Sequence, residues 1–186
     1  MGFTLLTLTS IQFATAPVYA EEVKPTAESN NEKPPSQEET ASKVLNLYEG
    51  SWDSEKTVKK TSWIKEKLKE SEKKSAQWTL NDKYLEILSQ GEKQTTKEVN
   101  CFNEQSKDFQ KFIFDTNGNT SYWTGKWDEP SKTMTWTLNF DVIKGIIIDR
   151  FVADAKPDEY KTWYSTFILT DKNGCLLLDI SAKNTK

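Results

Sequence analysis

Apolar and polar residues alternate with a period of two through most of the chain after Gly50. The clearest stretch is 133–140, where every even-numbered residue is apolar and every odd-numbered one is a threonine or an asparagine. Such alternation is typical of a β-strand with one face on the core and the other on solvent. Asn-Gly pairs at 117–118 and 173–174 predict tight hairpin turns between such strands.

About eight to ten alternating stretches follow one another at intervals of about 10 to 12 residues, and no long helical pattern interrupts them. This series predicts an all-β fold, either an antiparallel barrel or a sandwich. Short connections between consecutive strands favour the up-and-down barrel, because closing the sheet leaves no exposed edge. Ahead of the strands, apolar residues at helical spacing in 41–49 predict one short helix.

Three segments of different character divide the chain. Residues 1–20 form an apolar stretch with small residues at its end, which predicts a signal peptide cleaved before Glu21. Residues 21–40 are rich in Glu, Pro, Asn and Ser, which predicts a disordered acidic linker, and residues 41–186 form the barrel domain. We therefore expect an exported protein, periplasmic or extracellular. Polar residues interrupt the first stretch, so no stable membrane span is expected after cleavage.

The negative charge of the chain is concentrated ahead of the barrel. The sequence carries 25 Lys and Arg against 28 Asp and Glu, a net charge of −3. Residues 21–49 hold seven Glu and three Lys, so the domain that follows is close to neutral. A nucleic-acid partner would need a basic face, so none is expected. The lysine-rich stretches at 55–60 and 69–74 are interpreted as solvent-facing strand surfaces.

The sequence contains no histidine, which removes the commonest acid/base group and the commonest metal ligand. It also has no Cys-x-x-Cys pair, so neither a metal nor a cofactor is expected. An enzyme such as a hydrolase or an isomerase would depend on carboxylates, which mostly lie at turns or strand ends, where they satisfy local backbone donors. The candidates are Asp53, Glu86, Asp115, Asp128, Asp141 and Asp149. We interpret the protein as non-enzymatic.

The two cysteines are Cys101 and Cys175. An even number in an exported protein allows a disulfide between them. Both lie in apolar strand patterns, so two buried free thiols are the alternative.

Two Gly-x-Trp segments stand out, at 50–52 and 125–127. The first follows the predicted helix and opens the first predicted strand. In this segment and three others the chain resembles DUF1579, an uncharacterised family of bacterial proteins that are often exported. The other three segments are Trp-Thr-Leu-Asn-Asp-Lys-Tyr-Leu at 78–85, Tyr-Trp-Thr-Gly-Lys-Trp-Asp at 122–128 and Lys-Thr-Met-Thr-Trp at 132–136. The resemblance implies a lipocalin-like barrel of the calycin group and supplies no catalytic residue.

Lipocalins commonly stack an arginine of the last strand on the indole of the Gly-x-Trp segment. The last strand here offers only Lys183 and Lys186. The resemblance therefore implies barrel closure by Gly50, Trp52 and Lys183, or a barrel end that is closed in a different way.

A barrel of this size either fills its interior with side chains or holds one ligand. Its aromatic-rich strands favour a carrier of a small hydrophobic molecule. The predicted lining residues are Trp78, Tyr84, Phe112, Phe114, Trp136, Leu138, Phe140 and Phe167. The alternative is a packed barrel that serves as a protein-interaction module. Its contact surface is then expected at Trp63, Trp123 and Trp163.

Overall fold

The computed structural model describes residues 35–138, 140–154 and 159–186. The predicted signal peptide at 1–20 and most of the predicted linker at 21–40 lie outside these residues.

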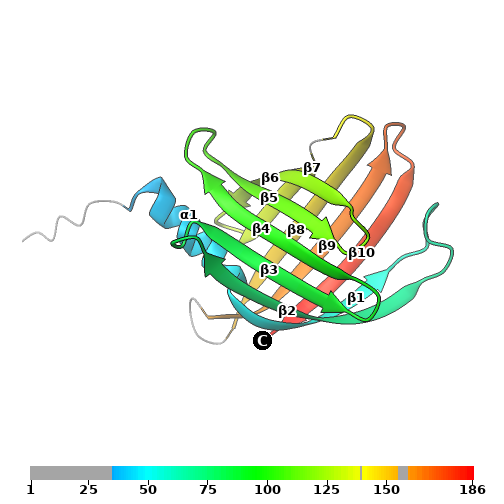
Figure 1. The fold of residues 1–186 in the computed structure, drawn as a ribbon, viewed down its shortest axis with the longest axis horizontal. Coiled ribbons are helices and arrows are strands. Elements are labelled where there is room, and N and C mark those ends of the chain that lie inside the picture. Colours follow the sequence, from blue (N-terminus) through cyan, green and yellow to red (C-terminus); the bar gives the residue numbers. More distant parts are fainter. Residues whose placement is uncertain (1–34, 139, 155–158) are drawn as a thin grey trace, which may run out of the picture. The chain divides into compact units, whose positions relative to one another are not determined.

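Within the described residues, ten antiparallel strands form a closed barrel in chain order, with β1 paired to β10 (Figure 1). The strands are β1 Gly50–Val58, β2 Leu68–Thr79, β3 Tyr84–Gly91, β4 Thr95–Asn103, β5 Asp108–Asp115, β6 Thr120–Asp128, β7 Thr133–Leu138, β8 Ile143–Ala153, β9 Tyr160–Asp171 and β10 Leu176–Thr185. Closure pairs every strand on both sides, so the sheet has no free edge. The prediction of an up-and-down, lipocalin-like barrel with a short N-terminal helix is confirmed.

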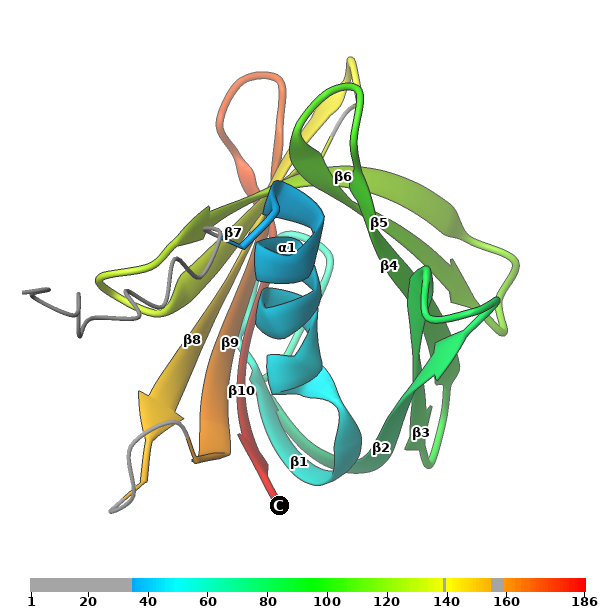
Figure 2. The same ribbon diagram turned by 90° about the vertical axis from the view of Figure 1, so that its left-hand side faces the viewer.

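The helix α1 spans Gln37–Leu45 and continues into a short 3-10 turn, η1, at Asn46–Tyr48. It starts inside the segment predicted as linker, because Ser36 and Glu39 form a capping box that satisfies the first free backbone N–H groups. Figure 2 shows α1 lying across one end of the barrel. Its buried face consists of Ala41, Val44 and Leu45.

The half of the barrel beneath α1 is a packed core. Side chains that alternate inward from successive strands meet there, and several are 5% exposed or less. They include Trp52, Leu85, Met134, Trp136 and Trp163. Trp163 lies edge-on to Trp52, with ring centroids 6.1 Å apart, so these two tryptophans pack against one another.

Half of the predicted lining residues point away from the interior. Tyr84 is 36% exposed and Phe114 44% exposed, whereas Leu85, the strand neighbour of Tyr84, is fully buried. Phe112 lies on the same outer face as Phe114, against the ring of Tyr122. Phe140, 63% exposed, follows the end of β7. For these four residues the prediction is wrong. In β3 and β5 apolar side chains occupy both faces of the strand, so the alternation alone does not identify the inner one, and Phe140 lies beyond the last residue of its strand.

Trp78, Trp136, Leu138 and Phe167 do face inward, as predicted. Trp136 is fully buried, and the other three pack against the core. The surface expected at three tryptophans is not formed, because Trp123 and Trp163 are buried and only Trp63 is exposed.

Both cysteines are free in the structure, so of the two possibilities left open by the sequence the disulfide is absent, and the alternative of two buried thiols fails for Cys175, which is exposed. Cys101 is half-buried in β4, and Cys175 is exposed in the turn before β10. The strands β4 and β10 are not neighbours in the barrel, which separates the two thiols.

Candidate functional site

Trp52 closes the barrel at the α1 end. Its Nε1 donates a hydrogen bond of 2.7 Å to the backbone oxygen of Tyr48. The ammonium of Lys186 lies 4.5 Å from the centre of the indole ring, in a cation–π contact. Burial beside this ring lowers the pKa of Lys186. The stem of Lys186 also packs on Gly50, whose φ of +109° suits glycine.

Lys186 therefore takes the role that the sequence assigned to Lys183. Lys183 is exposed, because inward and outward positions alternate along β10 and its neighbours Ala182 and Asn184 are the buried ones. Lys186 follows the last residue of β10, so its side chain can lie over the Trp52 ring without occupying an inward-facing position of the strand.

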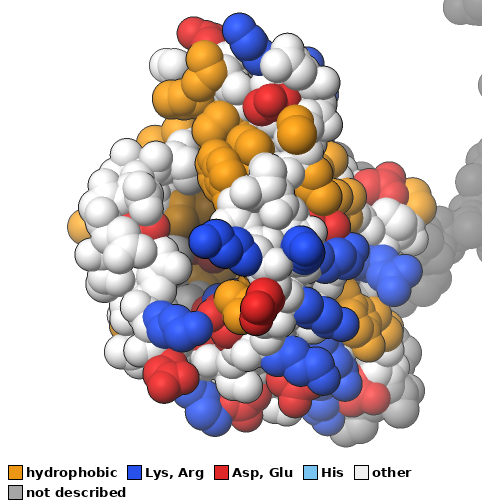
Figure 3. Space-filling view, turned by 90° about the vertical axis from the view of Figure 1, so that its right-hand side faces the viewer, with side chains coloured by type: hydrophobic (Ala, Val, Ile, Leu, Met, Phe, Trp, Pro, Cys, Tyr) orange, Lys and Arg blue, Asp and Glu red, His pale blue; other side chains and the backbone are white. Residues whose placement is uncertain are grey.

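The opposite end of the barrel is open. Several inward-facing apolar side chains towards this end are only half-buried, unlike most of those beneath α1, although Val58 on β1 is buried. The half-buried ones are Leu138, Phe167, Leu169, Leu178 and Ile180. Figure 3 looks onto this end and shows a hollow with hydrophobic side chains inside it and lysines near its rim. We call the interior between this end and the packed core the lumen.

The lumen has two unlike walls. Strands β7, β9 and β10 supply the half-buried apolar residues named above, which we call the apolar wall. Strands β1, β2 and β4 supply charged side chains, which we call the polar wall. Its Glu72 and Lys74 side chains are 6% and 9% exposed, and those of Glu98 and Lys56 are 15% and 23% exposed. The interpretation of 55–60 and 69–74 as outer surfaces is therefore wrong for Lys56, Glu72 and Lys74, which alternate into the lumen.

These charges are paired. Lys56 and Lys74 both contact the carboxylate of Glu72, at 2.7 Å and 3.1 Å. The ammonium of Lys111, on β5, lies 2.8 Å from Glu98 on β4 and 3.8 Å from Asp149 on β8. We call these six residues the charged network. It contains three positive and three negative groups.

Asp149 is the deepest member of the charged network, at 1% exposure. The Tyr48 hydroxyl and the Trp136 Nε1 donate hydrogen bonds to its Oδ2, at 2.9 Å and 3.0 Å. Burial and the neighbouring Asp149 raise the pKa of Tyr48 well above its usual value, so Tyr48 stays a neutral donor. The arrangement ties η1, the packed core and the charged network together.

The pKa of Glu98 is set by two opposing effects. Burial alone would raise it, but the positive charges of Lys111 and Lys74 outweigh burial and hold it below its ordinary value. Glu98 is therefore ionised at neutral pH.

Several buried polar atoms facing the interior have no hydrogen-bond partner among the described residues. On the polar wall and beside it these are the hydroxyls of Ser54 and Ser89 and both amide atoms of Asn100. Asn100 is fully buried, opposite Leu85 on one side and Lys111 on the other. An unpaired buried polar group costs free energy, so these groups indicate that water or a ligand lies beside them.

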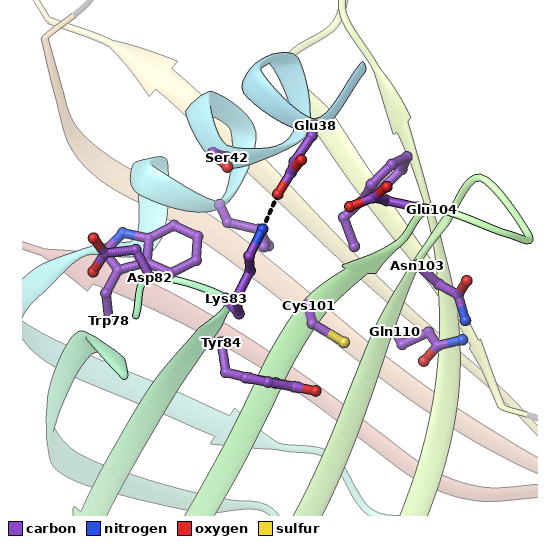
Figure 4. Close-up of a pocket in the computed structure, with 12 residues that line it drawn as sticks. Glu38, Ser42, Trp78, Asp82, Lys83, Tyr84, Cys101, Asn103, Glu104 and Gln110 are labelled. Atoms are coloured by element: carbon purple, nitrogen blue, oxygen red, sulfur yellow. Dashed lines mark hydrogen bonds and ion pairs between the residues drawn. The ribbon is translucent and has the colours of Figure 1, made fainter. Parts of the chain in front are cut away.

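A separate groove of about 320 Å³ lies where α1 meets β3 and β4 (Figure 4). An ion pair between Glu38 and Lys83 crosses it, and Tyr84, Cys101 and Gln110 line its outer side. Burial, with a smaller contribution from Asp108, raises the pKa of the Cys101 thiol. The thiol is therefore less reactive than a free cysteine, and the groove offers no activated nucleophile.

Of the carboxylates considered for catalysis, Asp149 is the one that the structure places in the barrel interior. Asp53 and Glu86 pair with lysines on the outer surface, Asp115 and Asp128 bond within their own turns, and Asp141 is exposed. Sequence reasoning missed Lys111, Glu98 and Asn100. These three residues can be recognised only by their inward-facing positions opposite buried residues of the neighbouring strands. Those positions become known only with the strand register, which the sequence alone does not give.

Comparison with known proteins does not assign the chain to a family. No protein-family model and no curated protein matches the sequence, so the resemblance to DUF1579 finds no support there. Among solved structures, the chain is similar to the S-type phycobiliprotein lyase of Guillardia theta, at 11% identity and a TM-score of 0.47, over 82% of this chain and 98% of that chain. A likeness at this level carries no inference about function. None of the helices in the described ranges is long and apolar enough to cross a membrane.

Proposed function

We propose that the protein binds a small amphipathic molecule in the lumen of its barrel. The observation that carries this proposal is the contrast between the two walls. On the apolar wall, Leu169 and Ile180 keep part of their apolar surface accessible. On the polar wall, the charged side chains of Glu98 and Lys56 are also partly accessible. A ligand with an apolar body and a polar group matches both walls, whereas a purely hydrophobic one would displace water from the polar wall without offering it a hydrogen bond.

The open end supplies the entry route. Inward-facing side chains can be partly solvent-accessible only if solvent reaches them along the barrel axis, and α1 covers the other end (Figure 2). The packed core then forms the floor of the site. Apolar area that becomes covered by the ligand stabilises the complex by about 25 cal/mol per Å² before the costs of binding are subtracted.

The alternative, a protein-interaction module, has less support. Two of the three tryptophans that were expected to form its surface, Trp123 and Trp163, are part of the core. That alternative also requires a fully packed interior, whereas several side chains towards the open end of the barrel are only partly buried.

Binding of Nile red, an uncharged amphipathic dye, tests the proposal. We expect the dye to gain fluorescence when it binds the full chain. Ile180→Glu places a charge on the apolar wall and should weaken binding at least about tenfold. Ser181→Glu adds the same charge one position along β10, on the outer face opposite Thr57 and Thr166, and should leave the affinity unchanged. Absence of dye binding, or equal losses in the two variants, would contradict the proposal.

We also propose that the protein is exported and belongs to the DUF1579-like group, on the sequence of residues 1–20 and the order of the tryptophan motifs alone. The expected result is a mature protein whose first residue is Glu21. Mass spectrometry of the protein isolated from its own cells measures this. A mature chain that retains residues 1–20 would contradict export by cleavage.

A further inference from the structure

We infer that the ligand of the lumen is an uncharged molecule, held through a head group that both donates and accepts hydrogen bonds. This inference rests on the proposed function and adds the chemical class of the ligand. It follows from how the polar side chains of the interior divide into those that have partners and those that do not.

Every charged side chain of the charged network is already compensated. Glu72 is shared by Lys56 and Lys74, and Lys111 lies between Glu98 and Asp149. Lys74 also lies 5.2 Å from the centre of the Trp163 ring, and Lys111 lies 4.5 Å from that of Trp136. A ligand carboxylate or ammonium would have to break one of these pairs and leave a charge behind in a poorly solvated interior. That outcome is costly because removing one partner of a buried pair exposes the full desolvation penalty of the other.

Asp149 Oδ1 has no hydrogen-bond partner among the described residues, although Asp149 is paired with Lys111 and its Oδ2 accepts two hydrogen bonds. The other unpartnered polar atoms along the polar wall belong to neutral side chains. Ser54 and Ser89 are 2% and 3% exposed, and Asn100 is fully buried, yet their polar atoms have no partner in the described part of the chain. A hydroxyl can donate and accept, and an amide side chain presents one acceptor and one donor group side by side. Together they match a neutral head group that carries both functions, such as a carboxamide or a hydroxyl.

The positions of these groups agree with binding from the open end. Ser89 pairs across the strands with Thr96, and Asn100 lies two positions beyond the inward-facing Glu98 on β4. The unpaired groups therefore follow the polar wall from the lumen towards the floor. The apolar part of the ligand would lie against the apolar wall, on β7, β9 and β10.

Three probes with the same ten-carbon chain separate the possible head groups: decanamide, decanoate and decylammonium. We expect decanamide to bind the full chain at pH 7 at least about tenfold more tightly than either ion, measured by isothermal titration calorimetry. Asn100→Leu should lower the affinity for decanamide about tenfold, and Ser89→Ala should lower it by a smaller factor. Ser71→Ala, an exposed position on β2, is the matched control and should have no effect.

The unfolding temperature of the ligand-free variants distinguishes recognition from a structural role. Replacing an unpaired buried amide with an apolar side chain of similar size removes a desolvation cost, so Asn100→Leu should not lower the unfolding temperature. Decanoate or decylammonium binding as tightly as decanamide would overturn the inference and leave the proposed function standing. Unchanged decanamide affinity in both Asn100→Leu and Ser89→Ala would also overturn it. If none of the three probes binds, the proposed function itself fails.

Discussion

Replacing Lys111 with methionine lowers the free energy of unfolding by about 3–5 kcal/mol, the usual cost of removing one partner from a buried ion pair. Lys111 is 3% exposed and is the cation shared by Glu98 and Asp149. Methionine has a similar length and fills much of the same volume, so the loss comes from two carboxylates that remain in the interior without their countercharge. Denaturation in urea at pH 7 measures it.

The pH dependence of this loss identifies its electrostatic origin. The folded-state pKa of Glu98 lies below its ordinary value, since Lys111 and Lys74 outweigh the effect of burial. Such a group contributes stability above its unfolded-state pKa, and that contribution disappears as the pH falls through the folded-state pKa. The difference between the native protein and Lys111→Met should therefore shrink at acidic pH, below the ordinary pKa of glutamate.

An exposed ion pair provides the control for Lys111→Met. Lys97 lies 2.9 Å from Glu86, but the two side chains are 48% and 30% exposed. Lys97→Met should change the free energy of unfolding by less than about 1 kcal/mol, because solvent screens the pair. Equal effects of the two substitutions, or a Lys111→Met effect that does not vary with pH, would contradict the charged network as described.

Gly125→Ala should destabilise the barrel by about 3 kcal/mol. A Cβ at this position would lie 2.5 Å from Cε3 of Trp136. The ring cannot move aside easily, because Trp136 is fully buried and its Nε1 is bonded to Asp149. The second Gly-x-Trp segment, at 125–127, thus owes its glycine to the close approach of an indole from the next strand. Thermal denaturation followed by circular dichroism measures the effect.

Two further variants test that explanation. At Gly91, an added Cβ would have its nearest contact at 3.3 Å, with the backbone oxygen of Gln94, so Gly91→Ala should cost no more than about 1 kcal/mol. In a Trp136→Leu background, Gly125→Ala should cost less than in the native protein, because the smaller side chain leaves room. Additive effects of these two substitutions would show that the ring is not what excludes a side chain at Gly125.

The architecture could be predicted from the sequence because its signals are local. Period-two alternation and Asn-Gly turns depend only on neighbouring residues, and they predicted the strands and the up-and-down order. The start of α1 was missed by four residues although the Ser36-x-x-Glu39 capping box is visible in the sequence. Export remains a prediction, since residues 1–20 lie outside the described residues.

The inner face of each strand was harder to predict, and the candidate site depends on it. Strand β5 shows the difficulty: Phe109 and Ile113 face inward, Phe112 and Phe114 face outward, and Lys111 lies inside between aromatic neighbours. Hydrophobicity therefore does not identify the inner face of such a strand, because both faces carry apolar side chains and the inner one also carries a lysine. The register with β4 and β6 decides, by pairing Lys111 with the buried Asn100 and Trp123.

By itself, the sequence determined that the fold is all-β, that histidine chemistry is excluded and that an acidic segment precedes the strands. It favoured the closed barrel over a sandwich, and the resemblance to DUF1579 implied closure at one end by a Gly-x-Trp segment. Only the tertiary structure decided which charges are inside and that Lys186 and not Lys183 covers Trp52. It also decided that the side-chain polar atoms of Ser89 and Asn100 have no hydrogen-bond partner within the described part of the chain. The physical reason is that strand alternation is set by neighbours in the chain, whereas pairing, burial and unmet hydrogen bonds are set by residues that the closed sheet brings together from distant strands.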